Sequence, residues 1–166
     1  MTLRLTFGID PGLSGAIATL VDGEPGPILD MPTRRVDGWN EVAADQLAQF
    51  ISEQRRQHPG AYVSACMEKV GARPGDGGTS AFRFGESSGK VKAILEAKGI
   101  PYVLAIPAVW KRHMGLLKQD KDAARLLAIR RFPSAADRLT RKKDNGRADA
   151  LLIGLWCESQ ETRRVA

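Results

Sequence analysis

Cysteine and histidine are scarce in this sequence, with two of each among 166 residues. Cys66 and Cys157 lie in apolar runs and lack the close spacing of a metal-binding or redox pair. We therefore expect two reduced, buried thiols, as is typical of cytosolic proteins, and no disulfide scaffold.

Long apolar runs are also missing, since no stretch reaches the roughly 20 residues that a bilayer span needs. The first residues alternate as in a strand and do not form the apolar run of a signal peptide. The sequence contains no repeat, low-complexity tract or convincing linker. We expect a cytoplasmic protein with no membrane partner, folded as a single domain over residues 1–166.

Basic residues are in excess, with 25 Lys and Arg against 19 Asp and Glu, a formal net charge of +6 and a pI of about 9.6. This balance favours a polyanionic partner, because cationic side chains attract phosphates and release their counterions. Several acidic residues nevertheless fall in or beside apolar segments. A protein that attracts phosphate and also places carboxylates at strand ends is expected to bring metal ions between them.

Hydrophobic periodicity predicts three consecutive strands, followed by strands and helices in alternation. Asp22-Gly23 is a hairpin-turn signal, with Pro25 and Pro27 lengthening the connection, and Asn40 is expected to cap the first helix. The expected strands span residues 3–9, 16–21, 28–31, 61–67 and 101–106, and later helices span 79–98, 108–114, 122–131 and 145–160. This order predicts an α/β fold, a mixed five-stranded sheet with three antiparallel strands and then parallel ones, flanked by helices.

Three acidic residues hold positions where such a sheet can gather them. Asp10 follows the first strand directly, Glu68 follows the fourth, and Asp149 lies in the last helix. If the two strands are neighbours, their carboxylates converge at one edge of the sheet. Taken singly, each acid has a plainer interpretation, as a turn residue, a salt-bridge partner and a first-turn helix carboxylate respectively.

Carboxylates gathered in one place repel one another unless a cation neutralises them or some of them bind protons. Oxygen ligands without histidine or cysteine suit a hard ion such as Mg²⁺, for which Mn²⁺ substitutes. Two such ions about 4 Å apart activate water and stabilise the leaving oxygen in phosphodiester hydrolysis. The pattern predicts a metal-dependent nuclease with two ions per active site.

Segments along nearly the whole chain resemble, in order, the motifs of RuvC-type Holliday junction resolvases. Residues 8–15 resemble the opening signature, 67–70 the second acidic motif, and 84–89 the helix of small residues after the glycine-rich loop. Residues 106–111 resemble the Pro-x-x-Val-Lys segment with one inserted residue, and 144–151 the closing Ala-Asp-Ala-Leu helix. The first motif alone is less specific, because actin-like ATPases also open with a strand and an Asp-Gly turn.

The resemblance implies an RNase H-like fold, a homodimer without a nucleotide cofactor, and paired metal-dependent nicks on opposing strands of a four-way junction. It implies Asp10, Glu68 and Asp149 as catalytic metal ligands. The family's fourth acidic residue stands one turn before the last aspartate, where this sequence has Gly146, so Asp144 is the nearest substitute as a ligand.

A second departure concerns an aromatic residue that the family has near the junction centre, three positions after the second acid. That position is Gly71 here, and Phe82 or Phe84 is the alternative wedge, unless both pack in the core. These differences and the short chain resemble a phage or prophage member, acting in the cytoplasm of an infected host.

Basic residues cluster beside the acid-bearing segments, and we expect them to contact DNA phosphates, although any single cluster is typical of a solvated face. The predicted DNA-binding residues are Arg73, Arg83, Lys90, Lys111, Lys118, Lys121 and Lys143. The tryptophans are expected to pack in the core. The apolar residues Val91, Ile94 and Leu95 form a candidate dimer interface.

Other functions stay open at this point. One is an RNase H-like nuclease for RNA–DNA hybrids or other branched DNA. Another is a sugar-kinase-like or actin-like ATPase, for which 166 residues are too few to hold a second phosphate loop and a nucleotide domain. A third is a non-catalytic binder of DNA junctions, which Asn145 and Gly146 suggest because they stand where an acid is expected.

Overall fold

A five-stranded mixed sheet forms the centre of the molecule. The computed structural model describes residues 2–71, 75, 77–120 and 122–165. Strands β1 (Arg4–Asp10), β2 (Ala16–Val21), β3 (Glu24–Asp30), β6 (Tyr62–Glu68) and β7 (Tyr102–Ala105) have the order β3-β2-β1-β6-β7. The first three pair antiparallel, β6 is parallel to β1, and β7 is parallel to β6. The predicted fold class is confirmed.

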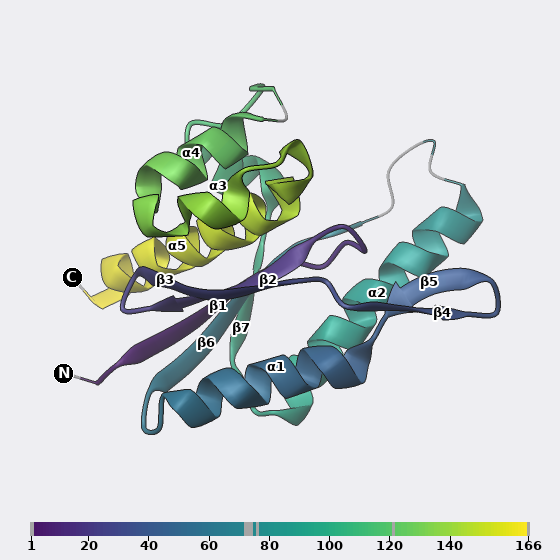
Figure 1. Ribbon diagram of the computed structural model, residues 1–166, viewed down its shortest axis with the longest axis horizontal. Helices are drawn as coiled ribbons and strands as arrows, with labels where there is room; N and C mark the ends of the chain where they lie inside the picture. Colours follow the sequence, from purple (N-terminus) through teal and green to yellow (C-terminus); the bar gives the residue numbers. More distant parts are fainter. Residues whose placement is uncertain (1, 72–74, 76, 121, 166) are drawn as a thin grey trace.

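Helices cover both faces of this sheet (Figure 1). One layer consists of α1 (Ala44–Gln57) and α2 (Gly78–Ala97). The other consists of α3 (Pro107–His113), α4 (Ala123–Arg131), α5 (Asn145–Val165) and two 3-10 helices, η1 (Pro133–Leu139) and η2 (Lys142–Asp144). Each layer buries its own apolar cluster against the sheet, as expected for a domain of packed layers.

The apolar face of α2 belongs to one of these clusters. Val91 and Leu95 are fully buried and Ile94 is 9% exposed, because they pack on β1, β6 and α1 within the same chain. These residues are therefore unavailable to a second copy, and the prediction of a dimer contact through them is wrong.

Two tight hairpins have the same Asp-Gly turn. Asp22 and Gly23 have φ values of 49° and 86°, the positive pair that a type I′ turn requires. Because β3 starts immediately at Glu24, Pro25 and Pro27 lie in this edge strand, which tolerates proline, and do not lengthen the connection as expected.

The second hairpin joins β4 (Thr33–Val36) to β5 (Trp39–Val42), with φ values of 48° at Asp37 and 83° at Gly38. Figure 1 shows it extending beyond the sheet, beside the N-terminal half of α2. Asn40 lies within β5, and α1 begins only after Ala43, so the predicted helix cap at Asn40 is wrong. All four residues of β4 are exposed, and the segment therefore lacks the apolar alternation that reveals a half-buried strand.

Helix α5 lies directly against the backbone of β1. A Cβ atom added at Gly8 would lie 1.9 Å from the carbonyl oxygen of Ala150 and 2.5 Å from the nitrogen of Gly154. Only glycine at position 8 permits this approach. The close packing fixes the residues of α5 relative to the end of β1.

Both cysteines are buried, as predicted. In the part of the chain that the structure describes, no helix combines the length and the apolar character needed to cross a bilayer.

Candidate active site

Two acidic residues end neighbouring parallel strands. Asp10 is the last residue of β1 and Glu68 the last of β6, and the two strands pair in register with Ile9 opposite Met67. Parallel strands bring their carboxyl ends to one edge of the sheet, so the sequence expectation that these acids converge is met by the topology. Asp149 reaches the same region from α5, and the charges of Asp10 and Glu68 both act on it.

The turn after β1 encloses the carboxyl group of Asp10. The Gly12 N–H donates a hydrogen bond to Asp10 Oδ1 at 3.1 Å, and Gly15 passes so close that an added Cβ would lie 2.7 Å from Asp10 Cγ. Burial raises the pKa of Asp10 to about 6; the Gly12 hydrogen bond opposes the rise, and the charge of Glu68 adds to it.

Asp149 is mostly buried, and one of its oxygens has no hydrogen-bond partner among the described residues. Burial raises its pKa to about 7, the charge of Lys111 opposes the rise, and the charges of Asp10 and Glu68 add to it. Its Oδ1 atom is buried and accepts no hydrogen bond from any residue that the structure describes. A buried carboxyl group in this state favours either a proton or a cation.

Glu68 is oriented by a buried tryptophan. Trp110 of α3 is fully buried, and its indole Nε1–H donates to Glu68 Oε1 at 3.0 Å. The Nζ atom of Lys111 lies 5.2 Å from the centroid of the same indole ring. The packing role predicted for Trp110 is correct, but its hydrogen bond to Glu68 was not predicted.

A pocket of about 360 Å³ opens beside Asp149. Its walls come from α3, α4, α5 and the connection between α3 and α4, and they are formed by Lys111, Leu116, Leu117, Lys118, Gln119, Asp120, Ala124, Asn145 and Asp149. The pocket therefore joins one proposed ligand to two of the predicted DNA-binding lysines. Three of its polar residues were not predicted as neighbours of the site: Gln119, Asp120 and Asn145.

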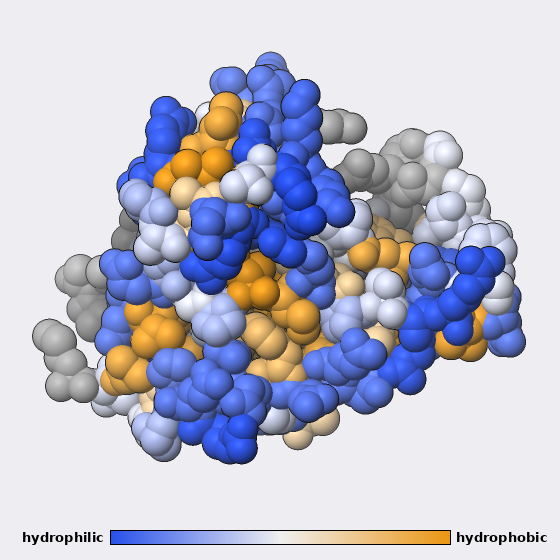
Figure 2. Space-filling view, viewed as in Figure 1, coloured by the Kyte–Doolittle hydropathy of each residue, from blue (hydrophilic) through white to orange (hydrophobic). Residues whose placement is uncertain are grey.

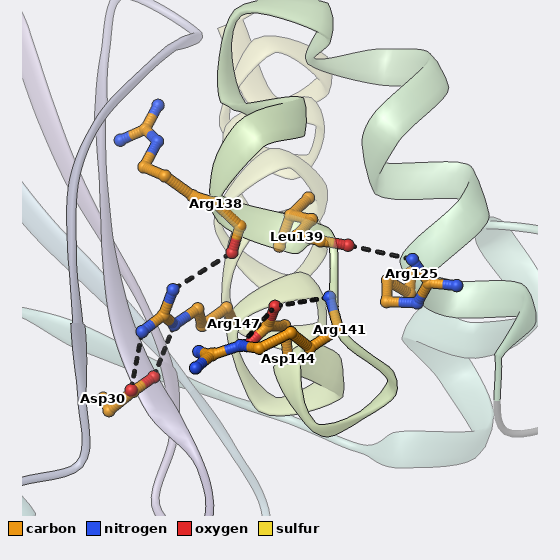
Figure 3. Close-up of polar contacts among 7 residues, drawn as sticks. All are labelled: Asp30, Arg125, Arg138, Leu139, Arg141, Asp144 and Arg147. Carbon is orange, nitrogen blue, oxygen red and sulfur yellow. Dashed lines mark hydrogen bonds and ion pairs between the residues drawn. The ribbon is translucent and has the colours of Figure 1, made fainter.

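Asp144 lies in a different electrostatic environment (Figure 3). Its carboxylate accepts hydrogen bonds from the Arg141 backbone N–H at 2.8 Å and from Arg141 Nη2 at 2.7 Å. Arg141 thereby holds the pKa of this buried acid below its ordinary value. Within the described residues, the charges that act on Asp144 do not include Asp10, Glu68 or Asp149.

Arginine contacts continue from Asp144 around the start of α5 (Figure 3). Arg147 donates two hydrogen bonds to Asp30 of β3, at 2.6 and 2.7 Å, and one to the Arg138 carbonyl at 3.1 Å. Arg125 of α4 donates to the Leu139 carbonyl at 2.9 Å. These contacts tie β3, α4 and the two 3-10 helices to the helix that carries Asp149.

The three acids are coupled by charge but do not form a preorganised metal cage. In the described ranges, no three Asp, Glu, His or Cys side chains are grouped closely enough to hold an ion as they stand. The donor set nevertheless has the required chemistry, because it is made of carboxylate oxygens. Asp10 and Asp149 have raised pKa values, and Asp149 also has an unpartnered buried oxygen. Like charges keep such side chains apart until a cation neutralises them.

The predicted DNA-binding residues fall into separate groups. Lys111 and Lys118 line the pocket beside Asp149, and Lys143 is exposed. Arg83 and Lys90 of α2 pair with acids: Arg83 Nη1 lies 3.5 Å from Glu86, and Lys90 Nζ lies 2.7 Å from Glu41. The predictions for Arg73 and Lys121 lie outside the described residues.

Aromatic side chains flank the site on the α2 side. Phe82 is 70% exposed, whereas Phe84 is half-buried, with its Cε2 atom 4.0 Å from where a Cβ of Gly12 would stand. Trp39 is 51% exposed, and the Cζ atom of Arg83 lies 5.2 Å from the centroid of its ring. Trp39 therefore departs from the expectation that the tryptophans pack in the core. Of the two phenylalanines considered as a junction wedge, only Phe82 projects into solvent.

Comparisons with solved structures identify the fold. RuvC of T. thermophilus in complex with a Holliday junction substrate aligns with a TM-score of 0.64, covering 97% of this chain and 96% of that one at 15% identity. The chain has the fold of RuvC. A second Thermus thermophilus RuvC structure aligns over the same shares at 16% identity, with a TM-score of 0.54. At these identities the alignments describe architecture alone.

A sequence comparison extends the likeness to a part of the chain. The chloroplastic Holliday junction resolvase MOC1 of Chlamydomonas reinhardtii is 38% identical over 84 residues. These residues are 50% of this chain and 10% of that protein. No family model matches the chain. The resemblance to RuvC-type resolvases that the motifs predicted is thus confirmed by an independent sequence match and by the RuvC fold.

Proposed function

We propose that this chain is a divalent-metal-dependent endonuclease that resolves four-way DNA junctions. The observation that supports the proposal is that Asp10 and Glu68 end neighbouring parallel strands of a RuvC fold, near enough to Asp149 for their charges to act on it, and that Asp149 has an unpartnered buried oxygen. The names of the similar proteins, a Holliday junction resolvase and RuvC bound to a junction, agree in the substrate that they indicate.

Asp10, Glu68 and Asp149 are the residues that would hold the cations, Mg²⁺ or Mn²⁺, two per site. When bound, such ions activate a water molecule and stabilise the leaving oxygen of a phosphodiester. We leave Asp144 out of this ligand set, since Arg141 occupies its carboxylate. The assignment of Asp144 as a ligand stays a prediction, which the Asp144→Asn variant tests.

The protein's own side chains prepare the site for a polyanion. Trp110 fixes the orientation of Glu68, and Gly12 fixes that of Asp10. Lys111 lies close enough to Asp10 and Asp149 to lower the pKa of both, and it brings a positive charge to the place where a phosphate would approach. Lys118 adds a second charge on the wall of the pocket.

More distant basic residues are proposed to position the DNA arms without reading sequence. Hydrophilic side chains predominate over the hairpin β4–β5 in Figure 2, whereas an apolar patch interrupts them over α4. Arg83 and Lys143 belong to this second set, together with Lys90, which must leave Glu41 to bind phosphate. Arg73 and Lys121 are retained as predicted members of the set. Replacing a phosphate-binding lysine or arginine by alanine is expected to reduce the salt dependence of DNA binding.

A homodimer is proposed because two opposing strands must be nicked. The solvent-facing side of α2 presents Phe82, Gly85, Gly89 and Ala93 in one stripe at helical spacing. Gly85 and Gly89 have nothing within 4 Å of an added Cβ, so a second helix can approach closely there. Introducing Gly89→Glu should leave the monomer folded and convert a dimer to a monomer, as measured by analytical ultracentrifugation.

The site draws its residues from one folded unit, and we assign residues 1–166 to one nuclease domain in the cytoplasm of a cell or of a phage-infected host. The chain covers only a tenth of the length of the algal relative, so activities of that whole protein are not transferred.

Cleavage of synthetic substrates tests the proposal. The protein is incubated with Mg²⁺ and a four-way junction, a linear duplex or an RNA–DNA hybrid, and the cut positions are mapped on every strand. We expect paired, symmetric nicks in the junction, none in the linear duplex, and none in EDTA. Cleavage of the hybrid alone would replace the proposal with an RNase H-type activity, and binding without cleavage would indicate a non-catalytic junction binder.

A further inference from the structure

The amide side chain of Asn145 belongs to the pocket that opens beside Asp149. Asn145 is the first residue of α5, four residues before Asp149 in the sequence. Residues at this spacing lie one above the other on the same face of a helix. Both residues line the same pocket, and both have a buried Oδ1 atom that accepts no hydrogen bond from the described residues. The pocket thus holds two adjacent acceptors to which the described part of the chain offers no donor.

Leaving a buried oxygen without a hydrogen-bond partner destabilises the folded protein. The neighbouring lysines do not relieve this deficit, because Lys111 and Lys118 line the pocket but donate no hydrogen bond to either oxygen. A hard cation between the two oxygens would supply the missing interaction, since amide carbonyls and carboxylates are both ligands of Mg²⁺ and Mn²⁺.

The next residue of α5 cannot contribute a ligand. A Cβ added at Gly146 would lie 2.5 Å from the Ser14 carbonyl oxygen and 2.8 Å from Gly15 Cα. Both are backbone atoms of the turn that encloses Asp10, so no side chain fits there without displacing that turn. The close packing that brings α5 to the catalytic turn therefore excludes an acid at position 146.

The residue before Asn145 is also committed elsewhere. Asp144 is 3% exposed, and both of its oxygens are bonded to Arg141. Of the residues at the start of α5, Asn145 alone combines a place on the pocket wall with an unpartnered buried acceptor, among the residues that the structure describes.

Resting on the proposed function, we infer that the Asn145 amide oxygen is a fourth ligand of the metal site, acting beside Asp149. A neutral ligand has a definite consequence. It adds coordination without adding a negative charge to three acids that already repel one another, so the metal-free site is less strained than one with four carboxylates. The corresponding cost is weaker attraction for the cation than a fourth carboxylate would give.

Calorimetric titration of the full chain with Mn²⁺, without DNA, tests this inference independently of cleavage. The variants are Asn145→Ala, Asn145→Asp and Asp149→Asn, with Gln119→Ala as a matched control that alters an exposed residue of the same pocket wall. Thermal unfolding in EDTA shows whether each variant is folded. We expect Asn145→Ala to weaken Mn²⁺ binding about tenfold, as the removal of a group that supports a metal site does. Asn145→Asp should bind Mn²⁺ at least as tightly as the parent, and Gln119→Ala should match the parent.

Two outcomes separate this inference from the proposed function. If Asn145→Ala binds Mn²⁺ as the parent does while Asp149→Asn loses binding, Asn145 is not a ligand but the metal site stands. If Asp149→Asn also binds like the parent, the proposed metal site itself is wrong, and the inference fails with it. Should Asn145→Ala unfold in EDTA, Asn145→Asp decides the matter: equal or tighter Mn²⁺ binding supports the ligand, and binding more than tenfold weaker overturns it.

Discussion

Two aspartates near the start of α5 have opposite environments. Asp144 is buried and bonded to Arg141 through both carboxylate oxygens, and its pKa is lowered. Asp149, five residues later, is mostly buried with an unpartnered oxygen, and its pKa is raised to about 7. The first acid has a bonded counter-charge within the chain, whereas the second has none among the described residues. This contrast distinguishes an acid paired with a cation of the same chain from the acid that we propose as a metal ligand.

The largest expected effect is the difference in cleavage rate between the two variants in which an aspartate is replaced by asparagine. Asp149→Asn should reduce junction cleavage at least about a hundredfold, because the variant removes a proposed metal ligand. Asp144→Asn should leave the cleavage rate within about threefold, since Asn retains an acceptor for the Arg141 N–H. Single-turnover cleavage in Mg²⁺ measures both rates. A large loss in Asp144→Asn, with the protein still folded, would support its predicted role as a ligand.

The stability of the fold should depend more on the arginine that pairs with Asp144 than on the arginine that pairs with Asp30. Arg141→Ala removes the guanidinium from the buried Asp144 carboxylate, which keeps only the hydrogen bond from the residue-141 backbone N–H, and we expect the larger loss in the free energy of unfolding for this variant. Arg147→Ala breaks the more exposed pair with Asp30 and should cost about 1 kcal/mol. Urea unfolding measures both values, and equal losses for the two variants would remove the distinction between buried and exposed pairs.

The pH dependence of the metal-free protein should show the same contrast. The folded-state pKa values of Asp10 and Asp149, about 6 and about 7, exceed the ordinary value of 3.8. The stability that their protonated forms contribute is fully present below about pH 4 and is lost as the pH rises through 6 and 7. Asp144 has a lowered pKa, so its contribution is present above about pH 4 and is lost in acid.

We therefore expect the free energy of unfolding of the metal-free protein to fall between about pH 4 and pH 7, and Asp149→Asn to make this fall smaller. Added Mg²⁺ should raise the melting temperature more at pH 8 than at pH 5, because protons compete with the cation for the same oxygens. Melting curves in EDTA and in Mg²⁺ at both pH values give the comparison. If the melting temperature of the parent protein in EDTA does not change with pH, the raised pKa values of Asp10 and Asp149 are contradicted.

The smallest effect concerns the orientation of Glu68. Trp110→Phe keeps most of the buried ring volume but removes the indole N–H that Glu68 accepts. We expect cleavage to fall about tenfold, as for other groups that orient a metal ligand. Stability should fall by about 1–2 kcal/mol. A matched control, Trp156→Phe, alters a buried indole of α5 in the same apolar cluster as Trp110 and should not affect cleavage at a given fraction of folded protein.

The central sheet could be predicted from the sequence because most of its strands are buried, and their apolar patterns mark them. Strands β4 and β5 could not be predicted in the same way because they are mostly exposed, although Asp37-Gly38 is the same turn signal as Asp22-Gly23. The meeting of Asp10 and Glu68 at one edge was predictable because both end strands of one sheet.

Interactions between distant segments were beyond the reach of sequence patterns. The hydrogen bond of Trp110 to Glu68 depends on the register between β6, β7 and the helix that follows. The exclusion of side chains at Gly146 depends on how closely α5 approaches the turn after β1. The engagement of Asp144 by Arg141 is local in sequence, and the Arg-x-x-Asp spacing could have indicated it.

Mn²⁺ binding to Asp149→Asn and Asp144→Asn, measured by calorimetry at about pH 8 where both acids are ionised in the parent, tests the contrast most directly. We predict that Asp144→Asn binds Mn²⁺ with the affinity and stoichiometry of the parent, and that Asp149→Asn binds at least about tenfold more weakly. Parent-like binding in Asp149→Asn, together with loss of binding in Asp144→Asn, would contradict the assignment of these two acids.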